Sequence, residues 1–343
     1  MKVGKMMEII VGKTAGFCYG VKKAVESAEN EINNSEEQVY CLGEIVHNKQ
    51  VVNELKEKGI KFVENIDEAS NKTIIRAHGI QKEVYEKAKQ KNIEIIDCTC
   101  PNVLKIHKIA KEYADNGYFI FLCGSKTHPE NLGTISYCGE NVYVIEKEND
   151  TIKALEKLEK TGIKKILVIS QTTYSLEKFY IIEEIIRNEL PRNIELEIKN
   201  TICKATELRQ KETEEISKKV DMMIIIGGAN SSNTKKLYEI SKQNCKNSIL
   251  VSEQNPKPGS QLSKDSIVVL YGSDSNVATS ISVPDLKGLT ASQAKTTLRD
   301  KNLNINIEGS GYVSTQEYSK DEQVPEGTII KVTLKPKLTS GGQ

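Results

Sequence analysis

Residues 7–32 read MEIIVGKTAGFCYGVKKAVESAENEI. The apolar run over residues 7–11 favours a short β-strand, and the glycine-bounded turn after it ends such a strand. From residue 22 the pattern becomes helical and continues to residue 32. The segment therefore predicts a strand, a turn and a helix, with Cys18 at the point where the strand gives way to the helix.

Two later segments repeat this unit with a cysteine at the same point. An apolar run over residues 93–97 leads into Cys98-Thr99-Cys100-Pro101 and a helical pattern, and Pro101 suits the first turn of a helix. Another run, over residues 194–198, leads to Cys203 and a helical pattern from 204 to 220. The three cysteines are far apart in sequence, 82 residues (18 to 100) and 103 residues (100 to 203), yet occupy equivalent positions.

Other apolar runs also end in polar groups. In open parallel α/β sheets, ligands bind beyond the carboxyl ends of the strands, so such groups are expected to face one cleft. We therefore predict an α/β fold of three small lobes with mostly parallel sheets around a central site. The groups are His47 after residues 39–46, His78 after 74–77, His128-Pro129-Glu130 after 119–123, Gln171-Thr172-Thr173 after 166–169, and Asn230-Ser231-Ser232-Asn233 after 222–226.

Composition indicates a soluble enzyme. The chain has 343 residues, a net charge of +1 and 28% charged residues, and it has no run of 18 apolar residues, so no nucleic-acid or membrane partner is indicated. Residues 1–6 lack the apolar core of a secretory signal, and we expect a cytoplasmic protein whose eight cysteines are ligands or buried thiols rather than disulfides.

Spacing alone leaves the role of the three cysteines open between ligands and buried structural thiols. Zinc sites usually include a close C-x-x-C pair, whereas Cys98 and Cys100 are only two residues apart. Iron–sulfur clusters accept distant ligands. Three cysteines on a 4Fe-4S cluster would leave one iron free to bind a substrate oxygen.

Eight motifs, in chain order over about residues 7–250, resemble the 4-hydroxy-3-methylbut-2-enyl diphosphate reductase family. That family removes a hydroxyl group reductively in the last step of the non-mevalonate isoprenoid pathway, giving isopentenyl and dimethylallyl diphosphates. The motifs are GFCYGV (16–21), EIVHN (44–48), RAHG (76–79), TCP (99–101), HPE (128–130), QTT (171–173), TICKAT (201–206) and NSSN (230–233).

The resemblance implies a role for each motif. Cys18, Cys100 and Cys203 would hold the 4Fe-4S cluster. Glu130 would be the proton source for the departing hydroxide, because a protonated carboxyl group in a closed site can act as a general acid. Thr172 would hold the substrate hydroxyl or the glutamic acid by a hydrogen bond.

The remaining motif residues would bind the diphosphate. Ser231 or its neighbours could instead simply cap the helix that follows, and His107, within a helix, is expected to be an ordinary surface or packing residue. The diphosphate ligands implied are His47, His78, His128, Ser231, Ser232 and Asn233. No G-x-G-x-x-G nucleotide motif follows a strand, so a ferredoxin or flavodoxin is the implied electron donor.

The carboxyl end departs from the family. Residues 253–260 read EQNPKPGS and residues 322–328 read EQVPEGT, an internal repeat. Between the copies, Thr290 and Gln293 form a capping-box pattern, and alternating strands follow from Leu303 and from Ile330. This order resembles a PASTA module, a small α+β unit that normally works outside the cell and is thought to bind cell-wall fragments.

We therefore expect a reductase body over residues 1–250 with lobes at 1–100, 101–190 and 191–250. A partial PASTA-like segment and linker would follow at 251–281, then a PASTA-like module at 282–337 and a disordered tail at 338–343. The third lobe would be shortened, would lack one diphosphate serine that the family carries in a later turn, and would expose apolar faces.

Two other functions remain open. An aconitase-like hydratase would also use an open iron, although such enzymes usually place two ligands in C-x-x-C. A non-catalytic fusion would carry a damaged reductase body and a tail that binds cell-wall fragments. A natural fusion, a joining made by cloning and a misassembled gene are all compatible with the sequence.

Overall fold

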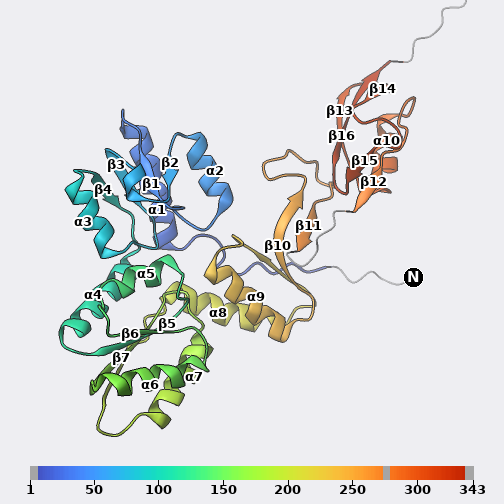
Figure 1. Cartoon of the computed structure of the whole chain (residues 1–343). Coiled ribbons are helices and arrows are strands. Elements are labelled where there is room, and N and C mark those ends of the chain that lie inside the picture. Colours follow the sequence, from blue (N-terminus) through green and yellow to red (C-terminus); the bar gives the residue numbers. More distant parts are fainter. Residues whose placement is uncertain (1–6, 273–278, 337–343) are drawn as a thin grey trace, which may run out of the picture. The chain divides into compact units, whose positions relative to one another are not determined.

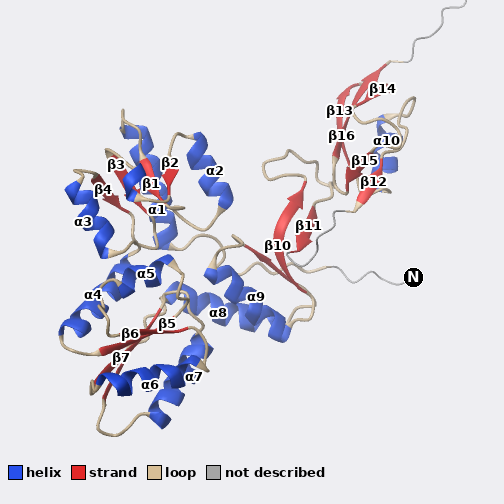
Figure 2. Cartoon of the chain, in the orientation of Figure 1, coloured by secondary structure: helices blue, strands red, loops and turns tan. Residues whose placement is uncertain are grey.

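The computed structural model of the chain describes residues 7–272 and 279–336 (Figure 1). These residues fall into two compact units. The first holds the residues up to Met223 together with Gly227–Ser248, and the second holds Ile224–Ile226 and the residues from Ile249 on. Helices and strands alternate through most of the first unit, whereas strands dominate the second (Figure 2).

The first lobe is a four-stranded parallel sheet in the order β2-β1-β3-β4. The buried face of helix α1 consists of three small residues, Gly20, Ala24 and Ala28, which recur every four positions. Their small side chains let the helix backbone lie close to the residues packed against it. The elements are α1 (Tyr19–Asn34), β1 (Tyr40–Leu42), α2 (Lys49–Glu57), β2 (Lys61–Val63), the 3₁₀ turn η1 (Ile66–Glu68), β3 (Lys72–Ile75), α3 (Lys82–Gln90) and β4 (Glu94–Asp97).

The second lobe repeats the architecture with the strand order β6-β5-β7-β8, again all parallel. All five residues of β5 are buried, as expected for a central parallel strand covered on both faces. The elements are α4 (Pro101–Asp115), β5 (Phe119–Cys123), α5 (Pro129–Ile135), β6 (Val142–Ile145), α6 (Asp150–Thr161), β7 (Lys165–Ser170), α7 (Leu176–Glu189) and β8 (Glu195–Ile198). The predicted α/β class with parallel sheets is confirmed.

Helices α8 (Lys204–Ser217) and α9 (Ser232–Asn244) complete the first unit. The predicted strand over residues 7–11 is wrong: this segment has no regular secondary structure, and Ile9 and Val11 are 76% and 74% exposed. A strand is stable only when another strand pairs with it, and among the described residues none pairs with this segment.

A further sheet, in the order β11-β10-β9, is formed by β9 (Met223–Ile226), β10 (Ser248–Asn255) and β11 (Val269–Gly272), and all its residues except Met223 and Ser248 belong to the second unit. Strands β10 and β11 are antiparallel. Ile224 and Ile226 on β9 are 46% and 77% exposed. The shortened third lobe remains a prediction.

A small α+β module follows, built from β12 (Ser280–Ser282), α10 (Ala291–Arg299), β13 (Asn304–Gly309), β14 (Tyr312–Gln316), β15 (Gln323–Pro325) and β16 (Ile329–Lys335). Helix α10 begins with the predicted capping box, in which Thr290 and Gln293 each accept a hydrogen bond from the other's backbone N–H. Leu303 and Ile330 lie in its core, whereas Ile307 on β13 is 37% exposed.

The β10–β11 segment is attached to this module by side-chain hydrogen bonds. The Asn255 amide donates to the carbonyl of Glu326 at 2.7 Å. The buried Asn304 amide donates to the carbonyls of Ile267 and Gly327 and accepts from the backbone of Ile267, each at 2.7–2.8 Å. The predicted disordered tail at 338–343 lies outside the described residues.

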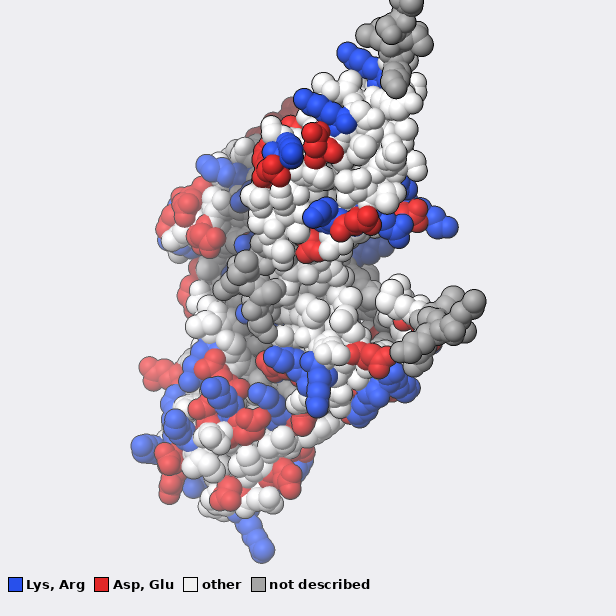
Figure 3. Space-filling view, turned by 90° about the vertical axis from the view of Figure 1, so that its right-hand side faces the viewer, with Lys and Arg blue, Asp and Glu red and all other residues white. Residues whose placement is uncertain are grey.

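Positive and negative side chains are interspersed over the face drawn in Figure 3. None of the helices formed by the described residues is long and apolar enough to cross a membrane.

Candidate functional site

Each of the three cysteines is the N-cap residue of a helix: Cys18 of α1, Cys100 of α4 and Cys203 of α8. None of the three thiols makes the usual side-chain capping bond, and each is half-buried. The predicted strand-to-helix position is confirmed for Cys100, after β4, and for Cys203, after β8. Cys18 begins a helix, but no strand precedes it.

The three thiols are close enough for Cys18 and Cys203 to act on the ionisation of Cys100. A Cβ atom built on Gly20, two residues after Cys18, would lie 2.5 Å from Cys100 Sγ, so α1 meets the Cys100 sulfur where it has no side chain. Burial raises the pKa of Cys100, and the neighbouring Cys18 and Cys203 thiols raise it further, while the backbone N–H groups of Asn102 and Val103 oppose the shift.

This arrangement fits a cluster better than a single ion. Among the described residues, the one group of three or more potential ligands whose atoms lie within 4.8 Å of one another is His47, His78 and His128. The three sulfur atoms are thus more widely spaced than around one tetrahedral ion. Three helix N-termini point their positive dipole ends at the thiols, which suits thiolate ligands and an anionic group.

Glu130 and Thr172 form a buried pair. Glu130 is 1% exposed, and its carboxyl group accepts two bonds from Thr172, one from the backbone N–H at 2.6 Å and one from the hydroxyl at 2.7 Å. Burial raises the pKa of Glu130 to about 7, against the lowering effect of both Thr172 donors. The carbonyl of Thr172 also accepts the backbone N–H of Cys203 at 3.1 Å, so this residue connects the acid to a cysteine.

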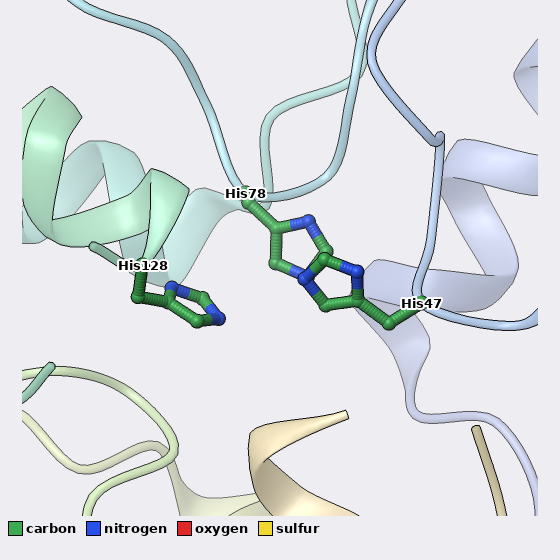
Figure 4. A group of neighbouring side chains, drawn as sticks. All are labelled: His47, His78 and His128. Atoms are coloured by element: carbon green, nitrogen blue, oxygen red, sulfur yellow. The ribbon is translucent and has the colours of Figure 1, made fainter. Parts of the chain in front are cut away.

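Three histidines converge from separate segments (Figure 4). His47 and His78 lie in the loops after β1 and β3 and stack with ring centroids 4.3 Å apart. His128 is the N-cap of α5, and its ring packs edge-on against the other two at 5.7 and 5.4 Å. We call these residues the histidine triad.

Burial disfavours the charged form of all three rings of the triad. Burial lowers the pKa of all three histidines, that of His128 to about 4 and that of His78 well below its usual range. The backbone N–H of Glu130 donates to Nδ1 of His128 at 3.2 Å, which leaves Nε2 of that ring as the donor. The buried Nδ1 of His78 has no hydrogen-bond partner. Nδ1 of His47 lies 3.6 Å from a carboxylate oxygen of Glu44, which opposes the lowering of the His47 pKa.

Helix α9 begins beside the triad. A Cβ atom on Gly228 would lie 1.9 Å from the His47 carbonyl oxygen, so the loop before α9 packs directly on the His47 backbone. Ser231 caps α9 by accepting the Thr234 N–H at 3.3 Å, as the capping alternative predicted. Its hydroxyl proton stays free to donate. The buried Oδ1 of Asn233 is unpaired, and Ser232 opens the helix.

Arg76 belongs to a predicted motif but had no predicted role. Its buried guanidinium group opposes protonation of every member of the triad. It fits against Gly43, where a Cβ atom would lie 2.3 Å from Nη1. The signal in the sequence was the place of Arg76 in the RAHG motif (76–79), directly after an apolar run and two residues before His78. His107 is a buried packing residue against Tyr137, as predicted.

Comparison with known proteins agrees with this geometry. The LytB protein family matches residues 9–282, and the PASTA domain matches residues 281–336. The first match runs through residues 251–281, which we assigned to a partial PASTA-like segment; that assignment remains a prediction.

Similar proteins are named 4-hydroxy-3-methylbut-2-enyl diphosphate reductase. The one from Caldanaerobacter subterraneus subsp. tengcongensis is 42% identical over 246 residues, which is 70% of this chain and 82% of that protein. The one from Clostridium tetani is 39% identical over 332 residues, 95% of this chain and 48% of that protein.

Two solved reductase structures share the fold. That of Plasmodium falciparum is 34% identical with a TM-score of 0.64 and covers 69% of this chain and 74% of its own. A second, described as the terminal enzyme of the non-mevalonate pathway, is 39% identical with a TM-score of 0.54 and covers 71% of this chain and 85% of its own. With its three N-cap cysteines and histidine triad, the chain belongs to the LytB protein family and carries a PASTA domain after the family's fold.

Proposed function

We propose that the chain is a 4-hydroxy-3-methylbut-2-enyl diphosphate reductase. The reaction breaks the substrate's carbon–oxygen bond and takes up two electrons and two protons. Water leaves, and isopentenyl and dimethylallyl diphosphates form. The observation that carries the proposal is the buried Glu130–Thr172 pair, which lies between the histidine triad and Cys203.

Cys18, Cys100 and Cys203 would hold a 4Fe-4S cluster, because all three begin helices and the Cys18 and Cys203 thiols act on the ionisation of Cys100. Among the described side chains, the one bonding partner of these thiols is Thr206, whose hydroxyl lies 3.2 Å from the Cys203 sulfur. When bound, the cluster supplies electrons and an iron that has no protein ligand.

Glu130 holds the proton that the departing hydroxide needs. With a pKa of about 7, a large fraction of Glu130 is protonated at neutral pH, whereas an ordinary glutamate is ionised there. Thr172 fixes both carboxyl oxygens, so the acid has one orientation. Because the Thr172 carbonyl is bound to the Cys203 backbone, that orientation is set relative to a cysteine ligand.

The histidine triad and the start of α9 would bind the diphosphate. An anion next to the rings favours their charged form, so binding raises the lowered pKa of each histidine and takes up protons. The Ser231 hydroxyl and the backbone N–H groups of Ser232 and Asn233 add donors at a helix N-terminus, a position that favours anions. Arg76 adds a fixed positive charge nearby.

Electrons would come from a ferredoxin or flavodoxin in the cytoplasm, where thiol ligands are kept reduced. The intact acid pair and thiols favour catalysis over the non-catalytic alternative. Binding of cell-wall fragments by the PASTA domain remains a prediction that a pull-down with purified peptidoglycan would test.

The test is anaerobic turnover of the diphosphate substrate with a dithionite-reduced viologen as donor. We expect both isoprenoid diphosphates to form with the wild type and a loss of turnover in Thr172→Val, which removes one of the two bonds that hold the acid. A protein with a complete cluster and no product would contradict the proposal.

A further inference from the structure

A surface depression of about 420 Å³ opens beside one of the three cysteines. It lies between the first half of α4 and the loop that leads into α8. Cys203 is part of its wall, and Cys203 also begins α8. We call this depression the Cys203 pocket. Its wall residues that matter below are Lys105, Lys199 and Lys204.

The Cys203 pocket is positively charged. Three of its ten lining residues are lysines and none is acidic. Lys204 pairs with Glu207 at 3.3 Å, but Glu207 also pairs with Lys211 at 2.7 Å, so one positive charge is left over. In the described part of the chain, no carboxylate lies within ion-pair distance of Lys105 or Lys199, although Glu197 and Glu112 are near enough to help raise the pKa of Lys199.

Lys199 is held in place by an aromatic ring. Its ammonium lies 5.1 Å from the centroid of Tyr113, and the hydrogen bond to that tyrosine raises the pKa of Lys199. This lysine therefore keeps its charge and has a preferred position at the rim, whereas a solvated lysine usually samples many rotamers.

We propose that the Cys203 pocket is the docking surface for a small acidic electron-carrier protein. This inference rests on the proposed reductase function, which needs electrons from outside the chain. Electron transfer falls off steeply with distance, so the carrier must approach one of the cluster's ligands, and this pocket opens onto one. Redox encounters use small contacts, and opposite charges steer them.

Charge reversal tests the proposal. The variant is Lys105→Glu combined with Lys199→Glu. The control is Lys111→Glu, which makes one such charge reversal later on α4, at a residue paired with Asp115 at 2.6 Å. Turnover is measured with a reduced ferredoxin and with a reduced viologen, which is small, cationic and independent of docking.

We expect kcat/KM for ferredoxin to fall roughly tenfold or more in the double variant, since steering changes association rates by ten- to thousandfold. The double variant should turn over at the wild-type rate with viologen. The Lys111→Glu control should have the wild-type kcat/KM for ferredoxin. Added salt should reduce the difference in kcat/KM for ferredoxin between the wild type and the double variant, because salt screens the charges.

An unchanged ferredoxin kcat/KM would overturn the proposal. Equal losses with both donors, or a raised KM for the diphosphate, would also overturn it and assign the lysines to the substrate. Calorimetric titration with oxidised ferredoxin at low salt separates the two hypotheses: a protein that turns over nothing with viologen but still binds ferredoxin through these lysines refutes the reductase and keeps the docking surface.

Discussion

The substitution Glu130→Gln removes the acidic proton of residue 130 but keeps the size and shape of its side chain. The glutamine oxygen can accept the backbone N–H of Thr172, and its amide can donate to the Thr172 hydroxyl, so both contacts persist. What is lost is an acid with a pKa of about 7. General acid catalysis contributes roughly 10²–10⁴-fold, and we expect kcat to fall by that factor while the KM for the diphosphate changes little.

We also expect the Glu130→Gln substitution to change how the free energy of unfolding depends on pH. Burial raises the pKa of Glu130 from 4.5 to about 7 in the folded chain. The folded state therefore binds its proton more tightly than the unfolded state. This contribution is fully present below about pH 4.5 and is lost as the pH rises through about 7, a change of roughly 3 kcal/mol at about 1.4 kcal/mol per pKa unit.

The assay is urea unfolding of the cluster-free protein, followed by helical circular dichroism from pH 5 to 8. The unfolding free energy of Glu130→Gln should rise relative to the wild type as the pH increases, since glutamine does not ionise. Glu140→Gln, at an exposed position, serves as the control. Turnover within about tenfold of the wild type, or a stability difference that does not depend on pH, would refute the role of Glu130 as a buried acid.

Four further predictions follow from the same geometry. Gly20→Ala should lower the iron content after reconstitution, because its methyl group would lie 2.5 Å from Cys100 Sγ; a normal content would show that the contact is not tight. Cys98→Ser should keep the wild-type iron content, since burial raises the pKa of Cys98 to about 11 and leaves it a poor ligand; iron loss would make Cys98 a ligand. Inhibition by inorganic pyrophosphate should weaken as the pH rises from 6 to 8, because the histidine triad must take up protons to hold an anion, and a flat profile would argue against the triad. Asn304→Leu should destabilise the second unit by roughly 2–4 kcal/mol, because three buried hydrogen bonds are lost; an unchanged melting transition would show that β10–β11 folds apart from the module.

Much of the secondary structure could be predicted from the sequence, because its signals lie within short segments of the chain. Apolar runs followed by helical periodicity located the cysteines, and the capping-box residues at Thr290 located α10. The prediction of a strand over residues 7–11 was wrong for a physical reason. The composition of the segment favours a strand, but a strand forms only where a neighbouring strand pairs with it. Strand β14 was missed because only Val313 among its residues is buried, so its alternation is faint.

The Thr172–Cys203 backbone bond could not be predicted from spacing. It joins residues that follow β7 and β8, and the bond forms because these two strands are neighbours in one sheet. The same holds for the lysines of the Cys203 pocket, which come from α4 and from the loop before α8. Sequence motifs identified the residues of the site, whereas the structure shows which of them act on one another.

The most direct test of the account is the iron and sulfide content of the chain after anaerobic reconstitution, measured beside Cys203→Ser and a Cys245→Ser control whose thiol is buried away from the site. We predict about four irons and four sulfides per chain in the wild type and the control, and a clear loss of both in Cys203→Ser. Equal contents in all three proteins, or a wild type that binds zinc and no sulfide, would contradict the claim that the three N-cap cysteines hold a cluster.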